Sequence, residues 1–313
     1  MKVLIIGGTG LVGSYLSSRC VSDGHDVFVI SRSGKMLQKS VHFIKCDISV
    51  PGYSKDLNKN FDIVVHLAYA TSEDPKYNRT VTYDSVVEVL EYFEDSNLKA
   101  FIYCGSMSVF GIDLPAGLID ENTIRVPDCD YARNKIDVCE ILMSANVSFQ
   151  VSILHPTGVY DTFSKRLKSY RDMLSGGYIC LDAGGAGINN IVHADDVALA
   201  IIACFTRVLG CSAEEYIING ELISYGEWLS ILERSLGKAK LPRIPVQLIK
   251  LCRWPLRSAL SVLGFRPPIL LPAYKRAMFE RKTIFISDKA FVHLGWSPNR
   301  HFINVIADSV RYL

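Results

Sequence analysis

Three features are scarce or missing in this sequence: an imbalance of charge, paired cysteines and long apolar runs. The 34 basic and 32 acidic residues are mixed along all 313 positions, which leaves no broad basic surface for nucleic acid. The nine cysteines are scattered without a C-x-x-C pair, which argues against a disulfide framework and a structural zinc site. The longest apolar run, Val197–Phe205, is far shorter than the ~20 residues of a membrane span. We therefore expect a cytoplasmic protein with reduced thiols and no metal, membrane or nucleic-acid partner.

What is present, in the first half, is an alternation of short β-branched runs with segments of helical periodicity. This alternation predicts an α/β fold with a Rossmann-type, doubly wound parallel sheet that is buried on both faces. The expected strands are Lys2–Ile6, Asp26–Ile30, Val41–Lys45, Asp62–Leu67, Ala100–Cys104 and Phe149–Leu154. The expected helices between them are Leu11–Ser22, Val81–Glu94 and Tyr131–Ala145, where apolar residues recur at helical spacing.

The alternation of strand-like and helix-like segments stops after His155-Pro156, where glycine clusters and a proline-rich stretch follow. Strand-like runs return briefly at Ile191–His193 and Glu215–Ile218, so we expect the chain to re-enter the first domain. The predicted Rossmann domain comprises residues 1–156 and about 191–219. A smaller α/β C-terminal domain, formed by residues about 157–190 and 220–313, is expected to bind the substrate.

Glycines 7, 10 and 13 follow directly on the first expected strand and open the first expected helix. A tight strand-to-helix turn needs residues without a Cβ, and a pyrophosphate can then approach the backbone closely. The helix N-terminus adds free N–H groups and a positive dipole. This turn predicts binding of a dinucleotide at Gly7–Gly13.

The second expected strand is followed by Ser31-Arg32-Ser33, without the carboxylate that would bind the ribose 2′-hydroxyl of NAD. An arginine between two hydroxyls suits a 2′-phosphate, which favours NADP over NAD. Stacking of Arg32 on the adenine, or exposure to solvent, stays open, and so does NAD itself. Asp47 follows the third strand, where its carboxylate would accept a hydrogen bond from the adenine amino group.

Tyr131 and Lys135 are spaced i and i+4, which places them on one face of one helix. A nearby ammonium favours the phenolate, so this pair is suited to move a proton near neutral pH. Ser106 and Ser108 lie where the fifth strand runs into a turn, at the sheet edge where parallel sheets bind ligands. Either hydroxyl could hold a substrate carbonyl there.

In these motifs the sequence resembles the extended short-chain dehydrogenases/reductases, in particular the branch that modifies NDP-sugars, which includes epimerases and dehydratases. The resemblance covers nearly the whole chain in one order: the glycine turn, Asp47, His66–Ala70, Ser106–Gly111, Tyr131–Lys135, His155–Tyr160, Ile191–Ala198 and Leu294–Pro298.

The resemblance implies that Tyr131 is the general acid/base, that Lys135 binds the nicotinamide ribose and lowers the pKa of the tyrosine, and that Ser106 polarises the reacting carbonyl. His66 and His193 match positions with a mainly structural role. The substrate contacts would be Ser106, Ser108 and Tyr131. The implied cofactor contacts are Gly7, Thr9, Gly10, Leu11, Val12, Gly13, Arg32, Asp47, Ile48, Leu67, Ala68, Tyr69, Tyr131, Lys135, Pro156, Thr157 and Val159.

The chain also departs from the pattern of this family. Thr82 stands where an asparagine is frequent, and Tyr160-Asp161-Thr162 replaces the usual Tyr-Gly-Pro. Dehydratases usually carry acidic residues after the catalytic serine or threonine, where this chain has Met107-Ser108, so dehydration is disfavoured. Epimerisation at two carbons is disfavoured as well, because Ser108 occupies the position of the cysteine that it uses.

Three functions remain open. The first is an NDP-sugar 4-epimerase or 4-keto reductase, expected as a homodimer that pairs through Val81–Glu94 and Tyr131–Ala145. The second is an NADP-dependent reductase or dehydrogenase of an apolar, steroid-like or flavonoid-like substrate, for which Leu241–Pro272 would line the pocket. The third is a non-catalytic NADP-sensing protein. Basic candidates for a sugar nucleotide's pyrophosphate are Lys165, Arg166, Lys168, Arg243, Arg266 and Arg276.

Overall fold

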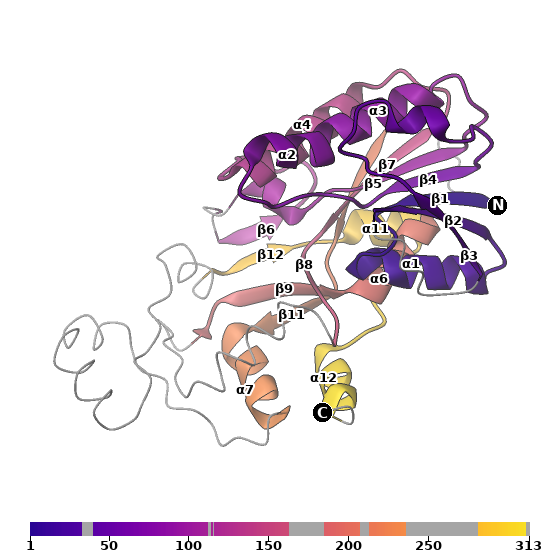
Figure 1. Ribbon diagram of the computed structural model, residues 1–313. Coiled ribbons are helices and arrows are strands. Elements are labelled where there is room, and N and C mark those ends of the chain that lie inside the picture. Colours follow the sequence, from indigo (N-terminus) through magenta and orange to yellow (C-terminus); the bar gives the residue numbers. More distant parts are fainter. Residues whose placement is uncertain are drawn as a thin grey trace, which may run out of the picture.

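A seven-stranded parallel sheet lies at the centre of the protein, here described from a computed structural model (Figure 1). The structure describes residues 1–32, 40–111, 114, 116–162, 185–206, 213–235 and 281–310. The strand order is β10-β7-β5-β4-β1-β2-β3, with a reversal of winding beside β1 that is typical of a doubly wound sheet. The strands are β1 Lys2–Ile6, β2 Asp26–Ser31, β3 Val41–Lys45, β4 Ile63–His66, β5 Ala100–Cys104, β7 Gln150–Pro156 and β10 Glu214–Ile218.

Helices cover both faces of this sheet (Figure 1). On one face lie α1 Leu11–Ser22 and α6 Ala194–Ala203, which pack against each other. On the other face lie α2 Pro75–Arg79, α3 Ser85–Phe93 and α4 Asp130–Ser144, with a π-helical turn at Thr80–Asp84 between α2 and α3. The predicted Rossmann fold is confirmed.

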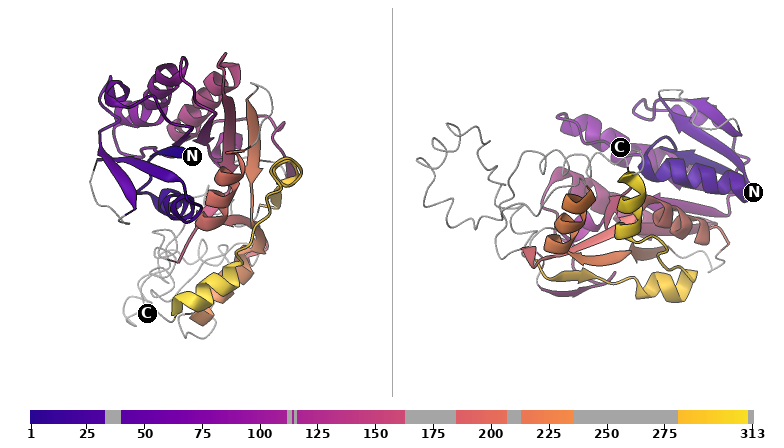
Figure 2. Two further views of the ribbon diagram at one scale, coloured as in Figure 1. Left: turned by 90° about the vertical axis from the view of Figure 1, so that its right-hand side faces the viewer. Right: turned by 90° about the horizontal axis from the view of Figure 1, so that it is seen from below.

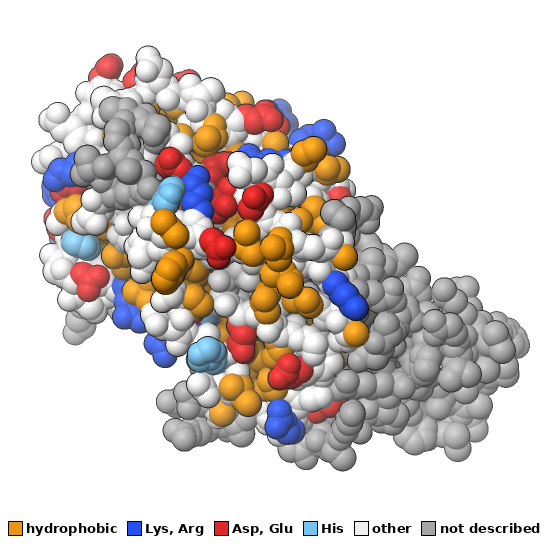
Figure 3. Space-filling model, turned by 180° about the vertical axis from the view of Figure 1, so that it is seen from behind, with side chains coloured by type: hydrophobic (Ala, Val, Ile, Leu, Met, Phe, Trp, Pro, Cys, Tyr) orange, Lys and Arg blue, Asp and Glu red, His pale blue; other side chains and the backbone are white. Residues whose placement is uncertain are grey.

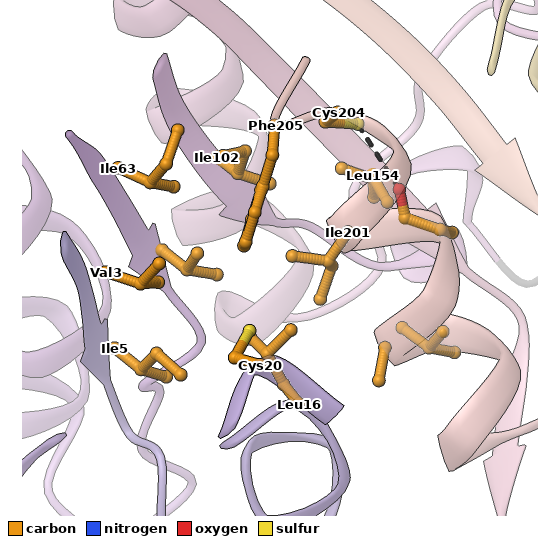
Figure 4. Packing of buried hydrophobic residues seen from close by; sticks show 14 of the residues in the cluster. Val3, Ile5, Leu16, Cys20, Ile63, Ile102, Leu154, Ile201, Cys204 and Phe205 are labelled. Atoms are coloured by element: carbon orange, nitrogen blue, oxygen red, sulfur yellow. Dashed lines mark hydrogen bonds between the residues drawn. The ribbon is translucent and has the colours of Figure 1, made fainter. Parts of the chain in front are cut away.

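The sheet separates two hydrophobic cores because alternate strand residues point to opposite faces. In β1, Val3 and Ile5 pack with Leu16 of α1 and Ile201 of α6 (Figure 4). Leu4 and Ile6 instead belong to the core beneath α3 and α4. Strand β3 departs from the expectation of burial on both faces, since as an edge strand it has no fully buried residue.

Two smaller sheets lie beside the main one. The first has the order β11-β9-β8, formed by Glu221–Ser224, Ile188–His193 and Gly158–Tyr160. The second pairs β6 Gly117–Ile119 with β12 Thr283–Phe285 in parallel. Helices α7 Tyr225–Ser235 and α12 Phe302–Val310 pack together near the first small sheet, whereas α11 Asp288–Leu294 lies against β10 (Figure 2). Short 3-10 turns occur at Tyr53–Asp56 and Met107–Phe110.

Two adjacent aspartates tie the C-terminal segment to α6. The carboxylate of Asp196 accepts the backbone N–H groups of Asn299 and Arg300, each at 3.0 Å. The indole of Trp296 donates to the Asp196 carbonyl at 2.9 Å. Asp195, 2% exposed, pairs with Arg300 and also with Arg19 of α1. The contacts with the C-terminal segment join positions 100–105 residues apart in sequence, and the Arg19–Asp195 pair joins positions 176 apart.

The predicted strands match the observed ones within about three residues at each end. The division into two domains with interleaved boundaries stays a prediction. None of the helices in the described ranges combines the length and the apolar character needed to cross a bilayer. On the described part of the face seen in Figure 3, acidic, basic and apolar side chains are interspersed.

Candidate active site

The turn between β1 and α1 can be built only with glycine at two positions. Gly7 has a φ of +88°, and a Cβ there would lie 2.9 Å from the backbone nitrogen of Ala68. A Cβ on Gly13 would lie 2.5 Å from the carbonyl oxygen of Gly7. The N–H groups in the first turn of any helix have no partner within the helix. In α1, which begins after Gly10, no side chain of the described residues caps them either.

A cavity of about 520 Å³ opens beside this turn, at the carboxyl ends of β1, β2 and β4. It gathers nine of the predicted cofactor contacts: Gly7, Thr9, Gly10, Arg32, Asp47, Ile48, Leu67, Ala68 and Tyr69. Ser31, one of the two hydroxyls predicted beside Arg32, also lines it, together with residues that were not predicted as contacts: Cys46, Ala70, Thr71, Ser72, Tyr77 and Val81. The predicted contacts Leu11, Val12, Gly13, Pro156, Thr157 and Val159 are not part of this lining.

One end of the cavity is rich in polar side chains. The exposed Arg32 donates from Nη1 to the hydroxyl of Tyr77. The hydroxyls of Thr9 and Ser31 lie 3.2 Å apart. Asp47, on the same wall, accepts two hydrogen bonds from Ser49, one from its backbone N–H at 3.0 Å and one from its hydroxyl at 2.8 Å. This end therefore presents a cation and several hydroxyls to any ligand.

Ser106, Tyr131 and Lys135 come together at the carboxyl end of β5. Ser106 caps the turn Met107–Phe110, and its Oγ accepts the Ser108 N–H at 3.2 Å. Tyr131 and Lys135 lie one turn apart on α4, and the Ser106 hydroxyl lies close enough to the Tyr131 phenol, as a donor, to lower its pKa. Lys135, 1% exposed, donates from Nζ to the carbonyl of Cys104 at 2.7 Å.

Burial dominates the acid–base properties of this trio. It raises the pKa of Tyr131, and the hydrogen bond from Ser106 opposes that rise. It lowers the pKa of Lys135 to about 8. The sequence led us to expect a lowered pKa for Tyr131 through Lys135. The structure differs, because loss of solvation outweighs the effect of neighbouring groups on the phenol.

Tyr69 joins the trio to the cavity. Its side chain is 55% exposed and lines the cavity wall. Its ring centre lies 5.6 Å from that of Tyr131, in an edge-on arrangement, and 5.6 Å from the Lys135 ammonium. A ligand in the cavity that extends past Tyr69 therefore reaches the trio.

Thr157 and Val159, two of the remaining predicted contacts, have partners within the fold. Pro156 is the last residue of β7. The hydroxyl of the next residue, Thr157, donates a hydrogen bond to Asn219 Oδ1 at 2.9 Å. Val159 of β8 packs against the core that includes α1 and α6. Ser108 is partly buried, and its Oγ has no hydrogen-bond partner among the described residues.

His66 and His193, expected to be structural, both make hydrogen bonds inside the fold. His66 Nε2 lies 3.1 Å from the hydroxyl of Ser85, and His193 Nδ1 accepts the Asp195 N–H at the start of α6. Burial lowers the pKa of His66 to about 3, so this imidazole is neutral over the physiological range.

Sequence reasoning missed a buried polar cluster behind the trio, formed by Cys139, His155, Glu215 and Arg125. One potential ligand atom from each of the first three lies within 4.8 Å of the others. However, the Glu215 carboxylate already pairs with the Arg125 guanidinium. One of the three potential metal ligands therefore has a cationic partner within the protein. The residues come from α4, β7, β10 and a loop, and no local spacing in the sequence connects them.

The comparisons with known proteins identify the family. The sequence pattern of the NAD dependent epimerase/dehydratase family matches residues 3–218. The chain belongs to this family of enzymes. Its resemblance to the extended short-chain dehydrogenases/reductases is thereby confirmed.

Two curated relatives illustrate the range of the family. The UDP-glucose 4-epimerase of Lactobacillus helveticus is 29% identical over an alignment of 167 residues that covers 47% of each chain. The match thus spans about half the length of that enzyme. The chloroplast stem-loop binding protein of 41 kDa b from Arabidopsis thaliana is 26% identical over 330 residues, covering 98% of this chain and 78% of that protein.

Two solved structures have the same fold over all of this chain. The UDP-glucose 4-epimerase from Thermotoga maritima, solved with UDP-glucose, has a TM-score of 0.78 at 20% identity and is covered to 98%. The UDP-glucuronic acid 4-epimerase from Bacillus cereus, solved in complex with NAD, has a TM-score of 0.75 at 20% identity and is covered to 99%.

The residues present fit the dinucleotide that gives the NAD dependent epimerase/dehydratase family its name. Glycine at positions 7 and 13 lets the backbone of the turn pack closely against Ala68 and against itself, and the uncapped first turn of α1 follows this turn, which lines the cavity. The volume and the polar end of the cavity suit an adenosine with its phosphates. Residues Gly7–Gly13, Arg32, Asp47 and Ala68 are therefore the groups that would hold it.

Proposed function

We propose that this protein is an NAD(P)-dependent oxidoreductase or epimerase that acts on a nucleotide sugar, as a 4-epimerase or 4-keto reductase. The observation that carries the proposal is the meeting of Ser106, Tyr131 and Lys135 next to the cavity, with Tyr69 between the two. The family membership and the UDP-sugar 4-epimerases among the relatives support the same reaction class.

The proposed reaction divides the work between cofactor and protein. The nicotinamide supplies the chemistry of taking up a hydride from a sugar carbon and returning it. Tyr131, in its phenolate form, takes the proton of the sugar hydroxyl on Oη as the carbonyl forms, and the resulting phenol gives it back on reduction. With substrate bound, Ser106 Oγ, which lies beside that phenol, turns its one hydroxyl proton to the same sugar oxygen and stabilises its partial negative charge.

Lys135 supplies a positive charge to this site. With a pKa of about 8, the ammonium is mostly protonated at neutral pH despite its burial. A cation one helical turn from Tyr131 stabilises the phenolate that accepts the proton on oxidation and re-forms on reduction. The carbonyl of Cys104 fixes its position at 2.7 Å. We also propose that the Lys135 ammonium binds the nicotinamide ribose.

We propose a preference for NADP over NAD on the basis of Arg32, whose guanidinium lines the cavity among hydroxyls. An arginine–phosphate hydrogen bond is worth about 1.5–3 kcal/mol, so Arg32→Ala should weaken NADP binding roughly tenfold or more and leave NAD unchanged. Titration of both cofactors tests this. Lys45→Ala, which removes an exposed cation of β3 outside the lining, is the control. Equal losses for both cofactors would refute the role in selection.

The substrate class is tested by incubating the protein with UDP-, GDP- and dTDP-sugars, each with NAD(H) and NADP(H). Nicotinamide absorbance and product identity are followed together. We expect a sugar epimer without net change of cofactor, or a 4-keto sugar reduced with stoichiometric oxidation of NADPH. Turnover of apolar ketones in the absence of any sugar-nucleotide turnover would contradict the proposal.

Two further predictions have no structural test. The basic candidates for the pyrophosphate, Lys165, Arg166, Lys168, Arg243, Arg266 and Arg276, lie outside the described residues, as does the whole of the apolar segment Leu241–Pro272. We also propose a homodimer that pairs through α3 and α4. Sedimentation at micromolar concentration should give twice the mass of one chain, 34.9 kDa, and a monomeric mass would refute it.

A further inference from the structure

The buried cluster behind the active site lies against both ends of the loop that carries Ser106. His155, at the carboxyl end of β7, is fully buried. On one side its ring touches Gly105, the residue before Ser106, because a Cβ at position 105 would lie 2.6 Å from His155 Nδ1 and 2.9 Å from Cε1. On the other side the ring meets Phe110, which ends the turn after Ser106, with ring centres 5.9 Å apart and an angle of 69°.

Within the described part of the chain, one nitrogen of the His155 ring lacks the hydrogen bond that a buried polar atom normally makes. His155 Nδ1 is buried and has no hydrogen-bond partner among the described residues, which normally costs a protein about 1–3 kcal/mol. The same atom is the one that approaches Gly105 most closely. The glycine backbone thus lies close against this atom, and a residue with a Cβ at position 105 would clash with the ring.

The opposite side of the imidazole is held by charge. His155 Nε2 lies 3.5 Å from Glu215 Oε1, and the other oxygen of Glu215 pairs with Arg125. Burial raises the pKa of Glu215, but His155 and Arg125 outweigh it and lower the pKa below its ordinary value. The carboxylate therefore stays ionised beside the ring. Because β10 carries Glu215 and pairs with β7, the ring is fixed against the sheet.

We propose that His155, held by the Glu215–Arg125 pair, is a positioning residue that sets the location of Ser106 by clamping Gly105 and Phe110. The backbone adds a second constraint, since the Gly105 N–H donates to the Leu154 carbonyl at 2.7 Å. The inference rests on the proposed function of Ser106 as a hydrogen-bond donor to the reacting oxygen. A displacement of about 1 Å at such a group can lower the rate about a hundredfold.

The test uses three variants of the full chain: Gly105→Ala, His155→Ala and the double variant. The assay is the epimerisation of UDP-glucose with saturating NAD or NADP. If another sugar nucleotide in the panel above is turned over faster, that one replaces UDP-glucose as the substrate. Gly105→Ala should push the loop from the ring and lower kcat at least tenfold, with KM and cofactor affinity nearly unchanged. In the double variant the added methyl enters the space left by the imidazole, so kcat should recover severalfold over Gly105→Ala.

His193→Ala provides the matched control, because this histidine is also buried but caps α6 instead of touching the Ser106 loop. Thermal unfolding of each variant gives the folded fraction to which kcat is referred. Should His155→Ala not fold, His155→Asn keeps a hydrogen-bonding group on a shorter side chain and replaces it in the double variant.

The pH profile gives a readout that a purely structural role would not move. The hydrogen bond from Ser106 lowers the pKa of Tyr131, so a displaced Ser106 should shift the rising limb of kcat against pH to higher pH in Gly105→Ala and His155→Ala. The limb should stay in place in His193→Ala.

The inference is overturned if losses in the two single variants simply multiply in the double variant, or if His155→Ala and His193→Ala have equal kcat and pH limbs. A failure of the proposed function looks different. Ser106→Ala would then keep its full turnover, whereas an inactive Ser106→Ala combined with no rescue refutes only the role of His155.

Discussion

Lys135 is the residue at which the requirements of stability and of chemistry conflict most clearly. An ammonium with 1% of its surface exposed is destabilised relative to the same group in the unfolded chain, where its pKa has the ordinary value of 10.5. The folded protein retains it because a charge beside Tyr131 is what proton transfer needs. At the residue scale, the site is a place where the fold accepts a cost in stability.

This cost can be measured through its pH dependence. Because the folded-state pKa is about 8 and the unfolded value 10.5, the unfolded state binds more protons between these values and folding stability rises with pH. The wild-type protein should gain roughly 3 kcal/mol over Lys135→Met between the two limits. Urea unfolding of both proteins at pH 7, 9 and 10.5 tests this. A difference that does not change with pH would show that Lys135 is not desolvated.

Single residues were predictable from the sequence where a motif fixes both residue type and position. The glycine turn, Ser106 and the Tyr131–Lys135 pair are of this kind, and the structure brings the last three together. The raised pKa of Tyr131 was not predictable, since burial depends on what packs around the phenol. Tyr77 was missed as well, because its contact with Arg32 joins positions 45 residues apart.

At the scale of the element, strand β1, the glycine turn and helix α1 form one unit whose shape depends on how closely its backbones approach. The predicted bounds of Lys2–Ile6 and Leu11–Ser22 are the observed ones, because alternating burial and helical periodicity are local signals. The glycines of the turn differ in how much space surrounds them. They can be ranked by the distance from an added Cβ to the nearest atom.

That ranking gives a testable series. A Cβ on Gly13 would lie 2.5 Å from the Gly7 carbonyl, whereas a Cβ on Gly10 would lie 3.2 Å from the same oxygen. Gly13→Ala should therefore destabilise the protein by about 1–3 kcal/mol and weaken dinucleotide binding at least tenfold, and Gly10→Ala should cost much less stability. Thermal unfolding and titration with NADP measure the two effects. An equal loss of stability in both variants would contradict the ranking.

Other elements could not have been predicted from local pattern. The strand pair β6–β12 joins Gly117–Ile119 to Thr283–Phe285, two short runs whose pairing depends on contacts across more than half the chain. The π-helical turn at Thr80–Asp84 replaces the start of the helix expected over Val81–Glu94. Thr82, noted as a departure from the family, is buried in this turn and accepts the Ala70 N–H at 3.3 Å.

At the scale of the whole molecule, the order of strands along the chain determines how the parts are joined. Strand β10 comes late in the sequence but lies at the edge of the central sheet, next to β7. Glu215 thereby reaches the back of the active site. The C-terminal segment returns to α6 through Asp196, so residues from both ends of the chain stabilise one body.

The contribution of this tie can be measured by removing one carboxylate. Asp196 is fully buried and holds two backbone N–H groups, so Asp196→Ala leaves both without an acceptor and should lower the free energy of unfolding by about 3 kcal/mol. The exposed Asp288 at the start of α11 provides the matched control, and Asp288→Ala should cost less than 1 kcal/mol. Urea unfolding that gives equal losses would refute the anchoring role.

The central claim is that Tyr131 moves the proton while a hydride is exchanged with a nucleotide sugar, and Tyr131→Phe tests it most directly. The substitution removes only the hydroxyl, so the packing against Tyr69 and the affinity for NADP should be preserved. Turnover of the sugar nucleotide, measured by product formation under saturating cofactor, should fall by about 10²- to 10⁴-fold. Unchanged turnover in a folded, cofactor-binding Tyr131→Phe variant would contradict the account.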